Sequence, residues 1–270
     1  MDDRLSCEKY PESLSGKAGP RDMFPTQKQK ILSFYEKQAV LSGSLLKLIA
    51  VATMLIDHTA AALLSENPVF LFQIAGRPIT LYLIMRLIGR IAFPVYAFLL
   101  TEGFVHTRNR KRYGMELFVF ALLSELPWNL LHANALLYPG QNVMFTLFFG
   151  YLGLCVCEKY KKDGAKAFLL LVCLVFVSAF ARCDYGAKGF VLILILYLLR
   201  EQKPLRTVCG VGILASGINT LGVAVGFAIP LFYNGKRGFI NSKVLKYCFY
   251  AIYPVHLLLL WVIKRRMLGL

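Results

Sequence analysis

An acid and a histidine side by side, Asp57 and His58, are the residues of this chain best suited to chemistry. They lie in LLKLIAVATMLIDHTAAALL, residues 45–64, which is long and apolar enough to cross a bilayer. A charge in hydrocarbon costs roughly 2.5–3.5 kcal/mol even on insertion scales, so such residues usually have a function. Histidine exchanges a proton near neutral pH, which makes His58 a candidate general base.

Further charged side chains are expected at the depth of this pair. The second apolar segment carries Arg86 and Arg90 on one helical face, and the third carries Glu125. At a rise of 1.5 Å per residue, Asp57 and Glu125 lie about 18 Å from the predicted inner ends of their helices. Arg86 and Arg90 lie about 10 and 16 Å from the predicted outer end of theirs, which places the four residues at one level. We expect each carboxylate to pair with an arginine. Because neighbours on a helix point about 100° apart, Glu125 is a better candidate than Asp57 to orient His58.

A purely structural interpretation of these charges is also open. Buried ion pairs could simply hold the helices together, although they stabilise poorly compared with apolar packing and leave His58 unexplained. A second buried histidine, His256, follows Pro254 in AIYPVHLLLL, where the proline is expected to kink the helix. His256 is either a core residue or part of the site.

Membrane helices must position these residues. Of the 270 residues 57% are hydrophobic, and apolar runs of about 17–25 residues recur along the chain. We predict an all-α, polytopic transmembrane helical bundle of about nine helices in the cell (inner or plasma) membrane. Helices are expected at 45–64, 79–105, 113–131, 143–157, 167–181, 190–199 and 247–263, with a turn or re-entrant loop at 65–78 and a hairpin of two short helices at 207–233.

The net charge of +16 fits a membrane protein with basic cytoplasmic loops, so no nucleic-acid partner is expected. With a cytoplasmic N-terminus, the inner side holds 22 Lys and Arg residues and the outer side holds 6. The basic tail at 264–266 falls on the outer side, which is unusual under the positive-inside rule and argues against this orientation. We divide the chain into a cytoplasmic tail (1–44), a transmembrane domain (45–264) in the lipid bilayer, and a short tail (265–270).

The N-terminal tail has no apolar segment of the signal-peptide type. Residues 31–38 form either a short helix on the membrane surface or an ordinary linker. The seven cysteines contain no CxxC pair, so we expect buried packing thiols and predict no metal site.

Two loops carry compact basic clusters, HTRNRKRYG at 106–114 and NGKRG at 234–238. Topology alone explains them, because cytoplasmic loops are basic. Alternatively, their cations and glycine-flanked backbone amides form a cytoplasmic site for a cofactor that bears polyphosphate.

The order of motifs along the chain resembles the TraX family, whose named member is the pilin N-acetylase of F-type conjugation systems. The resemblance covers about residues 45–260, and the family is similar to transmembrane acyltransferases such as heparan-α-glucosaminide N-acetyltransferase and the acyltransferase-3 proteins. The motifs are LKLIAVATMLIDH, RLIGRIAFPVYAFLLTEGFVHTRN, SELPW, GQNVMFTL, DYGAKG, YNGKRG and YPVHLL.

This resemblance implies acetyl-CoA as the cytoplasmic donor and places Asp57 and His58 at the reaction centre. His58 would deprotonate an acceptor arriving from the outer side, which is a peptide N-terminus, a small amine, an amino sugar or a hydroxyl. Arg90 and Asn142 are candidates for polarising the thioester carbonyl, and an acetyl-histidine intermediate is a variant. The CoA phosphates would be bound by Arg108, Arg110, Lys111, Arg112, Asn234, Lys236 and Arg237. Substrate or supporting contacts are expected from Arg86, Glu102, Gln141, Asp184, Tyr253 and His256.

Two other functions remain open from the sequence. Buried acids, arginines and histidines also mark proton relays, so a proton-coupled transporter is the first alternative. The second is a non-catalytic membrane component of a conjugation or secretion assembly, in which the charges serve folding only.

Overall fold

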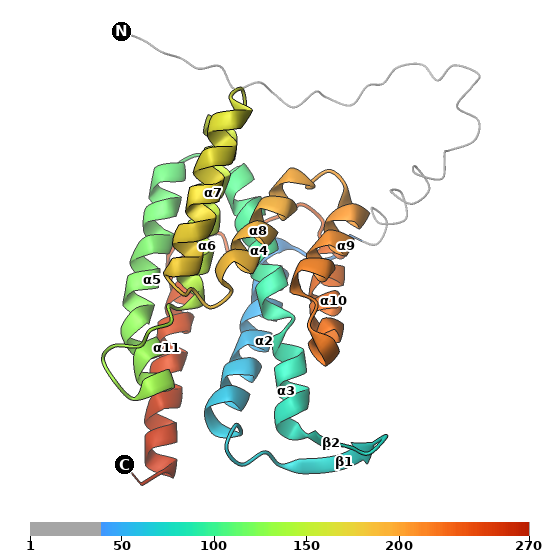
Figure 1. Ribbon diagram of the computed structural model, residues 1–270, viewed down its shortest axis with the longest axis vertical. Helices are drawn as coiled ribbons and strands as arrows, with labels where there is room; N and C mark the ends of the chain where they lie inside the picture. The colour runs from blue at the N-terminus through green and yellow to red at the C-terminus, as the bar shows by residue number, and fades with distance from the viewer. Residues whose placement is uncertain (1–38, 270) are drawn as a thin grey trace, which may run out of the picture. The chain divides into compact units, whose positions relative to one another are not determined.

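The computed structural model describes residues 39–269, and nearly all regular structure in this part of the chain is helical (Figure 1). This confirms the all-α class. The predicted N-terminal tail and its surface helix lie outside the described residues, apart from the tail's last few positions. The helices are α2 (Gly43–Leu63), α3 (Leu81–Gly89), α4 (Ala92–His106), α5 (Arg110–Ala133), α6 (Val143–Lys159), α7 (Gly164–Phe180), α8 (Gly186–Leu198), α9 (Lys203–Leu214), α10 (Thr220–Ala228) and α11 (Lys243–Met267), with 3₁₀ turns η1 (Gly217–Asn219) and η2 (Ile229–Phe232).

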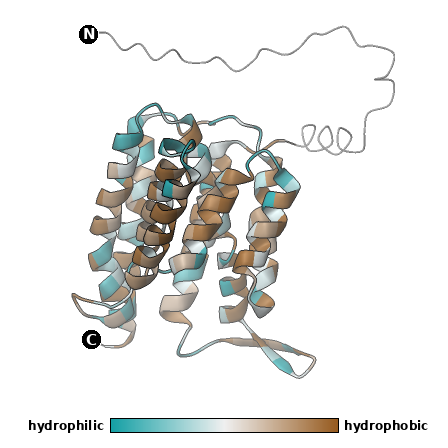
Figure 2. Ribbon diagram, turned by 45° about the horizontal axis from the view of Figure 1, so that its top comes forward, coloured by the Kyte–Doolittle hydropathy of each residue, from teal (hydrophilic) through white to brown (hydrophobic). Residues whose placement is uncertain are grey.

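Four helical segments among the described residues are long and apolar enough to cross a bilayer core of about 30 Å. They are α2, the α3–α4 pair, α5 and α11. Apolar residues run along the helices, and hydrophilic residues gather in the connecting loops at one end, whereas the β-hairpin at the other end is largely apolar (Figure 2). The chain is therefore a membrane protein, and the count of about nine crossings stays a prediction because the other helices are shorter.

The connecting loops gather at two opposite ends of the helices (Figure 1). At the end that we call the basic end, Arg112 donates to the Tyr247 hydroxyl at 2.9 Å and Arg110 lies 4.0 Å from Glu158. At the far end, the Trp261 indole donates to Asn134 at 2.9 Å. The loops predicted to be cytoplasmic thus share one end, and which side of a membrane it faces stays a prediction.

The stretch predicted as a turn or re-entrant loop forms a β-hairpin at the far end. Strands β1 (Phe70–Ile74) and β2 (Arg77–Thr80) pair antiparallel. Ala75 and Gly76 both have positive φ, of 48° and 76°, which is the type I′ geometry that suits the twist of a hairpin. The predicted helix at 79–105 therefore begins later, at Leu81, where the Thr80 hydroxyl caps it.

That predicted helix is also broken, into α3 and α4, at Arg90 and Ile91. Pro94 explains the break, because proline has no N–H to donate to the carbonyl of Arg90 and its ring would clash with that carbonyl. The break leaves Arg90 at the end of α3 rather than inside a continuous helix.

The α9–α10 hairpin packs against this break. A Cβ on Gly222 would lie 2.1 Å from the carbonyl oxygen of Leu87, so only glycine allows the contact. Each arm of the hairpin is about 18–20 Å long, which is too short for the bilayer core. Its tip, residues 215–219, therefore lies level with Arg90, and its body covers α4 toward the basic end.

The helices α6 and α8 begin near the same level. Asn142 caps α6 and donates to the carbonyl of Ala121, near the middle of α5. The Tyr185 ring, just before α8, stacks on Phe93 with centroids 3.6 Å apart. The buried core, which includes Phe104, fills the space between these helices and α4.

The cysteines do not all behave as predicted. All six described cysteines are free. Cys183 is buried, but Cys173 and Cys248 are exposed on helix surfaces, so the expectation of buried thiols is wrong for these two.

Candidate functional site

Asp57 of α2 binds both arginines that the sequence placed at its depth. Its Oδ2 accepts from Arg86 Nη1 at 2.6 Å, and its Oδ1 accepts from Arg90 Nη2 at 3.4 Å. The Asp57 side chain is 15% exposed and those of the two arginines are 27% and 23% exposed, so the cluster is half-buried rather than sealed. The predicted meeting of these three residues is confirmed.

Gly89 allows this close approach of α2 and α3. A Cβ at this position would lie 2.0 Å from Asp57 Oδ1, inside the carboxylate. Gly89 was not among the predicted site residues, although a glycine between two arginines in an apolar helix is a signal for close packing against a partner.

Glu125 does not pair with an arginine, contrary to the prediction. Its carboxylate accepts from the Asn142 amide at 2.6 Å. The second amide hydrogen of Asn142 goes to the carbonyl of Ala121, and its oxygen accepts from the N–H of Met144. Asn142 is thus a helix cap whose two amide hydrogens are both used, and its carbonyl-polarising role stays a prediction.

His58 pairs with His256 of α11. His58 Nδ1 lies 2.6 Å from His256 Nε2, and the rings are nearly parallel at 6°. His256 Nδ1 lies 2.8 Å from the carbonyl oxygen of Ile252. A carbonyl oxygen only accepts, so His256 Nδ1 carries the hydrogen. If both rings are neutral, His256 Nε2 must then accept, and His58 Nδ1 must donate.

This hydrogen-bond chain fixes the tautomer of His58. With its proton on Nδ1, His58 keeps a lone pair on Nε2, which makes no hydrogen bond within residues 39–269. The prediction that Glu125 orients His58 is therefore wrong, and His256 does so instead. The Tyr253 ring lies 6.0 Å from that of His58, and its buried hydroxyl has no partner in the described chain.

A cavity of about 150 Å³ lies beside Arg90, between the hairpin tip and the start of α8. The buried Nε of Arg90 has no hydrogen-bond partner among the described residues. Most of this lining was not predicted from the sequence, although Asn219 was predicted to interrupt the hairpin. The lining residues are Arg90, Tyr185, Leu214, Ser216, Asn219 and Val223.

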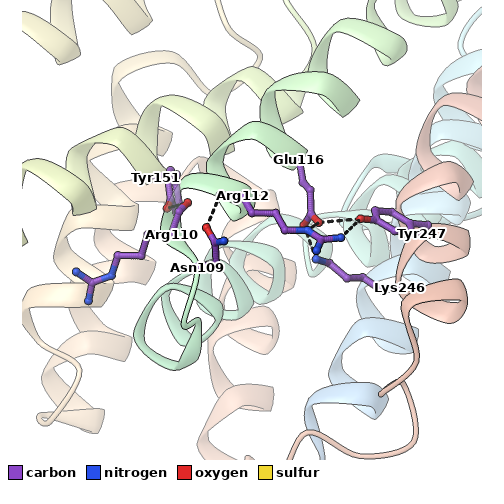
Figure 3. Close-up of polar contacts among 7 residues, drawn as sticks. All are labelled: Asn109, Arg110, Arg112, Glu116, Tyr151, Lys246 and Tyr247. Carbon is purple, nitrogen blue, oxygen red and sulfur yellow. Dashed lines mark hydrogen bonds and ion pairs between the residues drawn. The ribbon is translucent and has the colours of Figure 1, made fainter. Parts of the chain in front are cut away.

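The two basic clusters both lie at the basic end, but only some of their cations already have partners. Arg112 bonds to Glu116 at 3.0 Å and to Tyr247, as Figure 3 shows, whereas Arg110 points away from this group. Arg110 stacks over the Phe104 ring at 4.6 Å. These two arginines are already engaged.

The remaining predicted phosphate-binding cations make no ion pair within residues 39–269. They are Arg108, Lys111, Lys236 and Arg237. The backbone of the NGKRG loop folds onto the start of α2, where Gly43 N–H donates to the carbonyl of Lys236 at 2.8 Å and the Asn234 side chain accepts from Lys236 N–H. The positive charges of Arg237 and Lys246 act on Lys47, a cation that the sequence reading missed.

Among three other predicted residues, Glu102 lies away from the cluster, whereas the Asp184 carboxylate is close enough for the charges of Arg90 and Asp57 to act on it. Glu102 faces His106 at 3.5 Å and is about 18 Å from Arg90 along α4, so it is remote from Asp57. Gln141 and Asp184 meet through their backbones, with Asp184 N–H donating to the Gln141 carbonyl at 3.0 Å. Within residues 39–269, no group of three or more His, Cys, Asp or Glu side chains could hold a metal ion.

Comparison with known proteins supplies a family and a relative. A family model described as TraX protein matches residues 42–264. The probable fimbrial assembly protein FimC, serogroup H1, of Dichelobacter nodosus is 28% identical over 244 residues, which is 80% of this chain and 92% of the relative. No solved structure matches the chain.

Proposed function

This chain belongs to the TraX family, and from that membership and the His58–His256 pair we propose that it is a multi-pass cell-membrane acetyltransferase. The donor is acetyl-CoA and the acceptor is an amine, as the resemblance to pilin N-acetylases implies. The printed name of its relative, a probable fimbrial assembly protein, supports a place in a pilus or conjugation system.

The observation that carries the proposal is the free Nε2 of His58. The acceptor amine attacks the thioester carbonyl carbon, and His58 Nε2 takes a proton from the amine as the C–N bond forms. The C–S bond then breaks, and the departing thiolate takes that proton back from His58. The products are the N-acetylated acceptor and CoA thiol, with His58 restored. His256 holds the imidazole in the required tautomer throughout.

Arg90 is the group best placed to stabilise negative charge on the carbonyl oxygen. Asp57 holds Arg86 and one terminal nitrogen of Arg90, so Asp57 positions these cations rather than acting as the base. Arg90 lines the cavity, and its buried Nε makes no hydrogen bond within residues 39–269. A preorganised donor of this kind commonly contributes a hundredfold or more in rate.

The basic end has the chemistry needed for the CoA phosphates. Lys236 and Arg237 lack carboxylate partners among the described residues. Arg110 and Arg112 contact other groups, so we place the phosphates on Lys236 and Arg237 together with Arg108 and Lys111, which make no ion pair within residues 39–269.

A second candidate function is a non-catalytic assembly component. The printed name of the relative favours it, because that name describes assembly and no reaction. Under this alternative, the ion pairs and histidines only hold the helices together, and His58→Ala removes no chemistry.

The test uses the full chain in lipid nanodiscs. Calorimetry measures acetyl-CoA binding, and radiolabelled acetyl-CoA with amine acceptors measures transfer. We expect His58→Ala to lower transfer by about 10²- to 10⁴-fold with binding intact. We expect the Lys236→Gln/Arg237→Gln double variant to weaken acetyl-CoA binding, and a Lys161→Gln/Lys162→Gln control at the same end not to do so. Absence of both binding and transfer in the unmodified protein would sink the proposal.

A further inference from the structure

The β-hairpin at the far end, formed by β1 and β2, exposes large apolar side chains that nothing in the described part of the chain covers. Every residue from 65 to 78 is exposed. Five of them are large and apolar, with exposed fractions from 43% to 61%: Val69, Phe70, Leu71, Phe72 and Ile74. A two-stranded hairpin is at best marginally stable in water on its own, so these side chains need an apolar partner.

The hairpin lies across the direction of the helices. It connects α2 to α3 and leaves the bundle sideways, as Figure 1 and Figure 2 both show. Because α2 and the α3–α4 pair are the segments that cross the bilayer here, a hairpin in this direction runs along the plane of the membrane rather than through it.

An ion pair sets the level of the hairpin. Glu66, just before β1, lies 3.9 Å from Lys264 of α11, and Trp261 lies about one turn before Lys264. Tryptophan is enriched where a membrane meets water, because its ring is apolar and its N–H needs a partner. The Trp261 N–H has that partner in Asn134, at the end of α5. The hairpin therefore starts at the level expected for the surface of the bilayer.

We propose that the hairpin lies in the boundary between the head groups and the acyl chains of the leaflet at the far end, with lipid as its partner. Its apolar side chains then continue the lipid-facing surface of the bundle at the level where the helices end. The inference does not depend on acetyl transfer, and it holds or fails separately from the proposed function.

The backbone favours this boundary over the hydrocarbon core. The sheet has two strands only, so the outward-facing N–H and C=O groups of β1 and β2 have no ladder partner. Hydrocarbon offers these groups no hydrogen bonds, whereas the head-group region contains water. Arg77, the one charged residue from 67 to 80, lies at the turn, where its long side chain can reach lipid phosphates.

The edges of the hairpin are poorly suited to a further strand from another protein. β1 has a bulge between Phe70 and Phe72, and β2 contains Pro78, which has no N–H to donate. The strands are only 5 and 4 residues long. Short strands, bulges and prolines are the features that keep sheet edges from pairing. The side chains rather than the edges are therefore the surface that the hairpin offers.

The experiment measures the depth of the hairpin in the full chain, with one chain in each phosphatidylcholine nanodisc. Tryptophan is introduced at one position at a time, and the emission of the unmodified protein, which comes from Trp128 and Trp261, is subtracted. The hairpin probes are Phe72→Trp and Ile74→Trp. The quenchers are lipid brominated near the head group, lipid brominated near the chain end, and acrylamide in the water.

Two controls set the scale of depth. Phe176→Trp lies on the exposed surface of α7, about 18 Å from the start of this helix at Gly164 and so near the middle of the bilayer. Lys162→Trp lies in the loop between α6 and α7 at the basic end. We expect the deep bromines to quench Phe176→Trp most strongly, and acrylamide to quench Lys162→Trp most strongly.

For both hairpin probes we expect the shallow bromines to lower the added emission roughly twofold and to act more strongly than the deep ones, because interfacial segments insert only about 5–10 Å. Strongest quenching by acrylamide would place the hairpin in water and overturn the proposal. Strongest quenching by the deep bromines would make the hairpin a re-entrant segment, and no quenching would show that protein covers it. Either result also overturns the proposal. If one probe variant does not fold, the other gives the answer.

Discussion

Two clusters in this molecule each have one carboxylate between two cations. They differ in whether hydrogen-bonding groups in or beside the cluster lack a partner among the described residues. At the basic end, Glu116 accepts from Arg112, Lys246 and the Tyr247 hydroxyl, and its side chain is only 9% exposed (Figure 3). At the hairpin level, Asp57 holds Arg86 and Arg90.

The Glu116 cluster is saturated, whereas the Asp57 cluster is not. Lys246 and Tyr247 come from α11 and Arg112 from α5, so Glu116 joins two of the long helices. Within the described residues, Arg90 lines a cavity and its Nε makes no hydrogen bond, and His58, next to Asp57, has one imidazole nitrogen without a hydrogen bond. Unused hydrogen-bonding capacity, rather than buried charge, is therefore what distinguishes the functional cluster from the structural one.

Neutralising each carboxylate in turn is the most direct test of the different roles of the two clusters. Asp57→Asn leaves Arg86 and Arg90 without a counter-charge and should lower acetyl transfer by about a hundredfold, because the donors lose their position. Glu116→Gln should instead lower the free energy of unfolding by about 1–3 kcal/mol with transfer nearly unchanged. Transfer assays and thermal denaturation in the same nanodiscs measure both. The reverse pattern would show that the roles of the clusters are exchanged.

A smaller effect is expected at His256. His256→Leu removes the acceptor for His58 Nδ1–H, and we expect kcat to fall about 10- to 30-fold because the free nitrogen of His58 is no longer fixed. His256→Gln keeps an oxygen that can accept and should recover part of the rate. Steady-state kinetics on the two variants give the comparison. Equal loss in both would mean that His256 only fills space.

An effect on stability is expected from the contact that brings α3 onto α2. Gly89→Ala should cost about 1–3 kcal/mol of stability, because its methyl group would overlap the Asp57 carboxylate. Gly212→Ala in α9 is the control, since nothing lies within 4 Å of its added Cβ. Thermal denaturation distinguishes them, and equal melting temperatures would contradict the close packing of α3 on Asp57.

Counting residues along helices predicted part of this site correctly. A rise of 1.5 Å per residue gave the depth of Asp57, Arg86 and Arg90, and these three meet. The same counting placed Glu125 at that depth, but Glu125 faces Asn142. Depth follows from sequence position, whereas the direction in which a helix turns its side chains depends on its neighbours.

Breaks and short helices were harder to predict. The segment at 79–105 was predicted as one helix because its apolar run is continuous, and Pro94 divides it. The cavity lining at Tyr185 and Ser216 was missed, since these residues come from separate loops that meet only after the helices pack.

The sequence by itself determined the membrane class, the approximate helices, the clustering of basic loops and the importance of Asp57 and His58. These follow from hydropathy, charge and periodicity, which are local properties. Only the tertiary structure decided that His256 is the partner of His58, that Glu116 and not Asp57 has a saturated set of partners, and that Arg90 faces a cavity. Each of these depends on which groups from distant segments satisfy one another's hydrogen bonds, and that is settled by packing.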